Sequence, residues 1–141
     1  MIILDTNVVS EPLKPQPDPA VLQWLNAQLP ETLYLTTITV AELLAGADKL
    51  PAGRRKAELH DALIERILPL FDGRVLSFDL AAARTFAKVS TRSRAAGCPI
   101  SFADGAIAAI ACAQGFILAT RNVKDFSDTG IELINPWTSG A

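Results

Sequence analysis

The chain has 141 residues, of which 50% are hydrophobic and 20% charged, so it can fold as one domain with its own core and is not a disordered chain. Its formal net charge of -2 argues against a dedicated duplex-DNA binder, which is usually basic, although a cluster of metal-binding carboxylates would itself lower the charge. The only histidine, His60, lies in a charged stretch, so a histidine-based zinc site and a Ser-His-Asp triad are both disfavoured.

The sequence begins with a short apolar run over residues 2–4, which predicts a buried strand ending at the polar turn Asp5-Thr6-Asn7. Prolines at positions 12, 15 and 17 are expected to exclude regular structure up to Asp18-Pro19. That pair is a good N-cap and first residue for a helix ending before Pro30. Its buried face is expected to include Val21, Leu22, Leu25 and Leu29.

Helices and strands continue to alternate through the rest of the chain. Thr39 is expected to open a helix that fades near Gly53, and a more charged helix follows with its apolar face at Leu59, Leu63, Ile67 and Leu68. Asp79 caps a helix that stops at residues 97–99, and Ser101 caps a helix over 102–114 that Gly115 ends. The further strands are predicted at residues 33–36, 74–78, 116–119 and 131–134.

This alternation predicts an α/β fold with a mostly parallel sheet covered on both faces, and such sheets bind ligands outside the carboxyl ends of their strands. Asp5 directly follows the first strand. Glu42 and Asp104 are expected in the first turns of two helices whose N-termini open onto the same edge. Three acidic side chains that are far apart in the sequence are therefore predicted to meet at one rim of the sheet.

Each acid also has a purely structural interpretation. Thr39-x-x-Glu42 and Ser101-x-x-Asp104 both match a capping box, and Asp5 could simply order its turn. The apolar helix headed by Asp104 is expected to be buried nearly all round, where an ionised carboxylate is costly unless it is paired or bound to a metal. An all-oxygen ligand set favours Mg²⁺ or Mn²⁺, and such a site suits attack by metal-activated water on a phosphodiester.

These motifs resemble the PIN-domain family, and specifically the VapC-type toxins of bacterial toxin–antitoxin pairs. The resemblance runs over nearly the whole chain and is specific through the order and spacing of its parts. It is carried by Asp5-Thr6-Asn7, by residues 37–43, 104–109 and 118–126, and by the ending Asn135-Pro136-Trp137.

The resemblance implies a single PIN domain over residues 1–141, built as a three-layer α/β/α sandwich around a mostly parallel five-stranded sheet. It implies that Asp5, Glu42 and Asp104 surround Mg²⁺, for which Mn²⁺ is a plausible substitute. Such a protein is an endoribonuclease toxin that cleaves cellular RNA, such as tRNA or another RNA of translation. It forms a homodimer that can assemble further with a cognate VapB-type antitoxin, whose tail enters the active-site groove.

The family often has a fourth acid near the end of the fourth strand. Asn122 aligns with that position and is therefore a fourth catalytic candidate, while Asp125 is the nearest carboxylate. The choice between them stays open, as does the number of metal ions. Residues flanking the acids are candidates for substrate contact, and two of them, Arg121 and Lys124, could contact phosphate. The full set is Thr6, Asn7, Thr120, Arg121, Lys124 and Asp125.

Arg84, Lys88 and Arg92 recur at helical spacing and could line an RNA path with Arg94, although a solvated helix face is the simpler interpretation. A haloacid-dehalogenase-like phosphatase is disfavoured, because its D-x-D pattern would need an acid where Asn7 stands. A PIN nuclease of RNA processing and a non-catalytic PIN-like interaction domain remain alternatives.

A cytoplasmic location without membrane attachment is expected. The N-terminal apolar run lacks a basic region and is interrupted by Asp5, and the apolar tract 102–120 is typical of a buried helix followed by a strand. Cys98 and Cys112 are expected to be buried free thiols in a reducing compartment.

Overall fold

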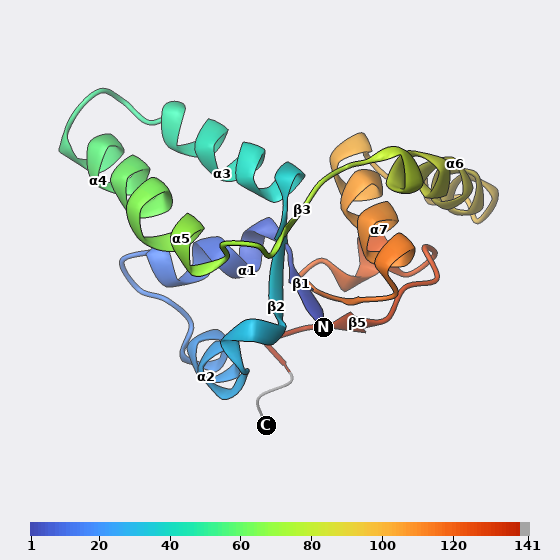
Figure 1. Ribbon diagram of the computed structural model, residues 1–141, viewed down its shortest axis with the longest axis horizontal. Coiled ribbons are helices and arrows are strands. Elements are labelled where there is room, and N and C mark those ends of the chain that lie inside the picture. The colour runs from blue at the N-terminus through green and yellow to red at the C-terminus, as the bar shows by residue number, and fades with distance from the viewer. Residues whose placement is uncertain (139–141) are drawn as a thin grey trace.

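The computed structural model, which describes residues 1–138, contains a five-stranded sheet between two layers of helices (Figure 1). The strands lie in the order β3-β2-β1-β4-β5, and every neighbouring pair is parallel. The expected α/β sandwich is therefore confirmed, with a sheet that is entirely parallel. The strands are β1 (Ile2–Leu4), β2 (Leu33–Thr36), β3 (Val75–Leu76), β4 (Ile117–Ala119) and β5 (Leu133–Ile134).

The helices connect these strands and lie on both faces of the sheet. They are α1 (Thr6–Ser10), α2 (Pro19–Ala27), α3 (Thr37–Asp48), α4 (Arg54–Ala62), α5 (Leu68–Leu70), α6 (Leu80–Ala95) and α7 (Phe102–Gln114). Short 3-10 turns lie at η1 (Glu11–Leu13), η2 (Pro30–Thr32) and η4 (Val123–Phe126), and a π-helical segment, η3 (Leu63–Ile67), joins α4 to α5. No helix in residues 1–138 is both long enough and apolar enough to cross a membrane.

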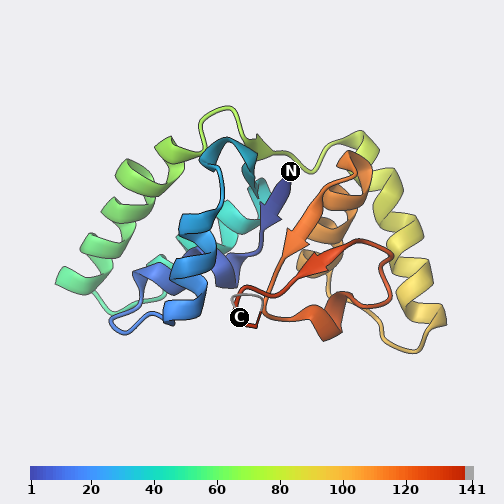
Figure 2. The same cartoon turned by 90° about the horizontal axis from the view of Figure 1, so that it is seen from below.

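Alternating strand residues divide the core between the two faces of the sheet. Leu4 and Leu35 point into a cluster with Val8, Trp24 and Leu43 from the helices of the N-terminal half of the chain. The opposite cluster contains Ile3 and Leu118 of the sheet, together with apolar residues of α6, α7 and η4. Figure 2 shows this division, with α2, α4 and α5 on one side of the strands and α6 and α7 on the other.

The first correction to the sequence interpretation concerns the segment after β1, where a helix forms in place of the predicted polar turn and Pro12 lies in the 3-10 turn η1, although regular structure was expected to be excluded there. The Oδ1 atom of Asp5 accepts a hydrogen bond from the backbone N–H of Thr6, so Asp5 caps α1. The prolines begin only at Pro12, after α1 has ended, and therefore do not interfere with it. Because α1 starts directly at the strand end, it fixes the direction of the residues that follow Asp5.

Two smaller expectations were also wrong. Leu29 is exposed because α2 ends at Ala27, and Trp24 takes the buried place on that helix. Cys98 and Cys112 are free thiols as expected, but both are exposed. Cys98 follows the turn that ends α6, and Cys112 lies in the last turn of α7, beyond the buried part of that helix.

Candidate active site

Asp5 lies at the centre of the sheet's carboxyl edge and is 4% exposed. Its backbone N–H donates to the carbonyl of Ala119 at 2.9 Å, which extends the pairing of β1 with β4 by one residue. Its Oδ2 atom accepts from the hydroxyl of Thr120 at 2.7 Å and from the side-chain amide of Asn7 at 3.5 Å. These bonds hold the carboxylate in one orientation at the end of two neighbouring strands.

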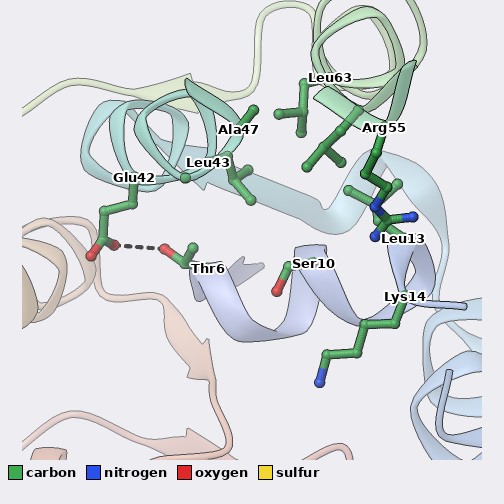
Figure 3. Close-up of a pocket in the computed structure, with 11 residues that line it drawn as sticks. Thr6, Ser10, Leu13, Lys14, Glu42, Leu43, Ala47, Arg55 and Leu63 are labelled. Carbon is green, nitrogen blue, oxygen red and sulfur yellow. Dashed lines mark hydrogen bonds between the residues drawn. The ribbon is translucent and has the colours of Figure 1, made fainter. Parts of the chain in front are cut away.

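Glu42 reaches the same edge from α3, but from the second turn of this helix and not from its first. The N-cap is Thr36, whose hydroxyl accepts from the N–H of Thr39 at 3.1 Å, so Thr39 lies inside the helix and does not open it. The expected capping box of Thr39 and Glu42 is therefore wrong. Thr6 Oγ1 instead donates to Glu42 Oε1 at 2.7 Å, and the carboxylate lies over the start of α1 (Figure 3).

A buried threonine behind this bond was not identified from the sequence as part of the site. Thr39 is fully buried, and its hydroxyl lies 3.4 Å from that of Thr6 and 3.3 Å from that of Thr36. The T-x-x-T spacing of residues 36 and 39, an N-cap followed three residues later by its donor, is the signal that could have placed the helix start correctly.

Asp104 occupies the first turn of α7, as predicted. The Ser101 side chain caps this helix by accepting from the N–H of Asp104 at 3.2 Å. The first of the two hydrogen bonds of a capping box is thus present. The Asp104 carboxylate itself is half-buried at the same rim. Gly105 follows it where an added Cβ would lie 2.7 Å from the Phe86 ring, so glycine allows α6 and α7 to pack closely beside the acid.

The acids influence one another electrostatically. Burial is the main reason that the pKa of Asp5 is raised, and the negative charges of Asp104 and Glu42 raise it further, while the bonds from Thr120 and Thr6 lower it. The pKa of Asp104 is also raised, first by burial, then by the charges of Glu42 and Asp125. Asp5, Glu42 and Asp104 therefore lie within electrostatic reach of one another, as the sequence predicted.

The structure separates the two candidates for the fourth position. The charge of Asp125 acts on Asp104, so this carboxylate lies on the Asp104 side of the site. Asn122 is joined to the site through its backbone, whose N–H donates to the Thr120 hydroxyl at 3.0 Å. Asp125 is therefore a carboxylate close enough to act on Asp104, and the roles of Asp125 and of the Asn122 side chain both stay predictions.

The donor chemistry of this rim suits a hard divalent cation. Within residues 1–138, no group of three acidic, histidine or cysteine side chains is gathered tightly enough to form a ready-made metal cage. Mg²⁺ commonly uses only one or two protein carboxylates and keeps several water ligands, so such a cage is not required. The ion pairs found in the described residues involve none of the three acids. A cation would thus relieve the repulsion among Asp5, Glu42 and Asp104.

A cavity of about 270 Å³ opens beside Glu42 (Figure 3). Thr6 and Glu42 lie at one end, and the basic side chains of Lys14 and Arg55 lie at the other. Between them its walls are mostly apolar and come from α1, η1, α3, α4 and η3, with Leu13, Leu43, Ala47, Leu59 and Leu63 among the lining residues. The groove therefore offers an elongated ligand an acidic end, an apolar middle and a basic end.

The residues predicted to contact substrate differ in how closely they are linked to the acids. Thr6, Asn7 and Thr120 bond directly to the acids, and the N–H of Arg121 donates to Asn7 Oδ1 at 3.2 Å. Lys124 is exposed on η4, and no ion pair found in the described residues includes it. On α6, Arg84, Lys88 and Arg94 are exposed, while Arg92 donates to the carbonyl of Thr129 at 3.4 Å.

Thr120→Val should test the support that Thr120 gives to Asp5. Valine keeps the shape of the buried side chain but removes the hydroxyl that donates to Asp5, and loss of such a supporting bond typically weakens metal affinity about 10- to 100-fold. The Kd for Mn²⁺ from isothermal titration calorimetry measures this effect. Thr129→Val, which removes another buried hydroxyl that bonds only to the carbonyl of Phe126, is the matched control and should leave the Kd unchanged.

Comparison with known proteins identifies relatives over nearly the whole chain. A family model described as PIN domain matches residues 2–132. Plasmid stability protein StbB from Pseudomonas syringae pv. tomato and VapC ribonuclease Y4jK from Sinorhizobium fredii are each 50% identical over 137 residues, which is 97% of this chain and 99% and 98% of the relatives. A tRNA(fMet)-specific endonuclease VapC from Shigella flexneri is 26% identical over 96% of this chain and 97% of its own length.

The solved structures agree with this result. The crystal structure of FitAcB from Neisseria gonorrhoeae matches with a TM-score of 0.94 at 44% identity and covers 98% of this chain and 99% of the matched chain. At this similarity the arrangement of strands and helices described above is shared almost throughout.

Proposed function

Since the chain belongs to the PIN-domain family and is a VapC-type toxin, we propose that it is a metal-dependent endoribonuclease that cleaves an RNA of the translation machinery. The observation that carries this proposal is the meeting of Asp5, Glu42 and Asp104 at one edge of the parallel sheet. We propose that residues 1–141 form one PIN domain and act in the cytoplasm, and that tRNA is the first substrate to test, because the relative from Shigella flexneri is named as a tRNA endonuclease.

In this proposal the chain's own residues hold the reacting groups. Asp5 and Asp104 would supply the carboxylates that hold the cation, and Glu42 would bind either the cation or a water molecule beside it. Bound Mg²⁺ would supply a water activated for attack on the phosphodiester and would offset developing negative charge. Thr120 and Thr6 hold the carboxylates of Asp5 and Glu42 in place, and Asp125 adds charge on the side of Asp104.

We further propose that a cognate VapB-type antitoxin inhibits the protein by placing its tail in the groove beside Glu42. A basic group of the tail near Glu42 and apolar groups against Leu43 and Leu63 would match the lining of this groove. The toxin is proposed to act as a homodimer that assembles further with the antitoxin.

Expression in a bacterial host without antitoxin tests the proposal. The wild-type chain should arrest growth and produce new RNA ends, concentrated in one RNA class, that high-throughput sequencing of 5′ ends will locate. The Asp104→Asn chain, expressed to the same level, should produce neither effect. Equal growth arrest by both chains, with no new RNA ends, would instead support a non-catalytic interaction domain.

A further inference from the structure

Arg121 is the basic residue most directly connected to the acidic site. It follows Thr120, which bonds to Asp5, and its own N–H bonds to Asn7. Its guanidinium lies over the indole ring of Trp137, with Cζ 5.1 Å from the ring centroid. Such stacking fixes the plane of the guanidinium and leaves its N–H edge free to bond.

Arg121 lies near one buried acid, Glu11, but does not form an ion pair with it. No ion pair found in residues 1–138 includes Arg121, although its charge helps to lower the pKa of the buried Glu11 carboxyl. The oxygens of Glu11 are bonded elsewhere, Oε1 to the Lys14 ammonium at 3.0 Å and Oε2 to the N–H of Asp18 at 3.1 Å. Glu11 is thus satisfied without Arg121, whose side chain remains able to bind an anion.

Trp137 is itself held in place by the turn that follows β5. The side-chain Oδ1 of Asn135 accepts from the N–H of Trp137 at 2.9 Å, and Pro136 between them is buried. The Trp137 side chain packs against the core cluster that contains Leu4 and Trp24. The indole is therefore a fixed surface, and this gives the Asn135-Pro136-Trp137 motif a role that the acidic site alone does not explain.

We infer that Arg121 and Trp137 together form a phosphate-binding site for the RNA backbone beside the acidic site, in which Arg121 contacts the phosphate and Trp137 is the residue that positions it. This inference rests on the proposed ribonuclease function. A guanidinium already held in its plane loses little freedom on binding, and its parallel N–H groups match two oxygens of one phosphate. The Arg121–Trp137 site therefore strengthens RNA binding and aligns the RNA backbone, and it takes no part in the chemical step.

RNA binding at several salt concentrations tests this inference. A single-stranded RNA labelled with fluorescein is titrated with protein carrying Asp104→Asn, which keeps the RNA intact, and log Kd is plotted against log salt concentration. Loss of one phosphate contact to a single strand should reduce the slope by about 0.7. Arg121→Gln and Trp137→Leu should each do so and weaken binding on the order of tenfold. Their combination should have little further effect, because both remove the same contact.

Two control variants separate this effect from general changes in charge or packing. Trp137→Phe keeps an aromatic surface and should retain most of the slope. Lys49→Gln removes one positive charge at the C-cap of α3, at the opposite end of this helix from the site, and should leave the slope unchanged. Circular dichroism of each variant checks its fold.

The inference is overturned if Arg121→Gln, or a folded Trp137→Leu, keeps the original slope. Should Trp137→Leu not fold, Arg121→Lys decides, because lysine keeps the charge but not the planar stacked group. Unchanged affinity of Arg121→Lys would then overturn the role of Trp137. RNA cleavage by the wild-type chain is measured separately, so a failure of the ribonuclease proposal is distinguishable from a failure of the Arg121–Trp137 site.

Discussion

Asp5→Asn is expected to reduce RNA cleavage on the order of a thousandfold or more while the protein remains folded. Asparagine keeps one carbonyl oxygen that can accept from the N–H of Thr6, and its NH2 group can donate to the Thr120 hydroxyl, so the change removes negative charge and retains the cap of α1. Without this charge, a cation is held less tightly and does less to stabilise the transition state. Single-turnover cleavage of the RNA identified in cells, at saturating Mg²⁺, measures the effect.

A carboxylate outside the site supplies the control for this experiment. Asp18 caps α2 by accepting from the N–H of Ala20 at 2.9 Å, and Asp18→Asn should retain cleavage because asparagine is a good N-cap. The same assay applied to Asp125→Asn and Asn122→Ala decides the fourth position, with the larger loss expected for Asp125→Asn. If Asp5→Asn kept a tenth of the wild-type rate, the proposed role of Asp5 would be wrong.

Mg²⁺ is expected to stabilise the fold, and more so as the pH rises. The pKa of Asp5 is raised above its ordinary value, chiefly by burial, so the folded, metal-free protein binds this proton more tightly than the unfolded chain does. The stability that this group contributes is complete below the unfolded pKa and is lost as the pH rises through the raised folded pKa. Asp104 acts in the same direction. A bound cation reverses the effect, and at 100 times its Kd it adds about 2.7 kcal/mol.

Thermal unfolding of the wild type and Asp5→Asn, each with Mg²⁺ and with a chelator, measures this linkage between about pH 5 and pH 8. In chelator at neutral pH, Asp5→Asn should be the more stable protein, and Mg²⁺ should favour the wild type. The comparison of the two proteins cancels the contribution of Glu11, whose lowered pKa acts oppositely and stabilises the fold above its unfolded pKa. A wild type that is more stable than Asp5→Asn at every pH in chelator would contradict the expectation.

Much of the fold could be predicted because its elements have strong local signals. Asp18-Pro19, Asp79, Ser101 and Gly115 mark helix ends that the structure confirms. The strands were located by apolar runs, although β3 and β5 are shorter than their runs, because only two residues of each pair with a neighbouring strand. Because parallel sheets bind ligands outside the carboxyl ends of their strands, Asp5, Glu42 and Asp104 could be predicted to lie at one edge without knowledge of any contact.

The remaining features depend on contacts between residues that are distant in the sequence. The start of the helix that carries Glu42 was misplaced because several neighbouring threonines could each serve as its N-cap. Only the buried hydrogen bonds between Thr36 and Thr39 distinguish them. Arg121 follows β4 and Trp137 follows β5, so their stacking depends on the pairing of these two strands, and no local sequence pattern predicts it. The exposure of Cys112 likewise depends on which part of α7 other segments cover.

The pairing of β1 with β4 also determines when activity can arise during synthesis. Asp5 is made first, but its partner Thr120 and the helix that carries Asp104 come from the last third of the chain. β1 cannot complete its pairing until β4 has been made, and parallel pairing across this separation forms late and slowly. A nascent chain therefore has no assembled site for most of its synthesis. Under the proposed function, RNA cleavage can begin only after α7 and β4 have been made, which leaves a period in which the proposed antitoxin can bind the chain before it is active.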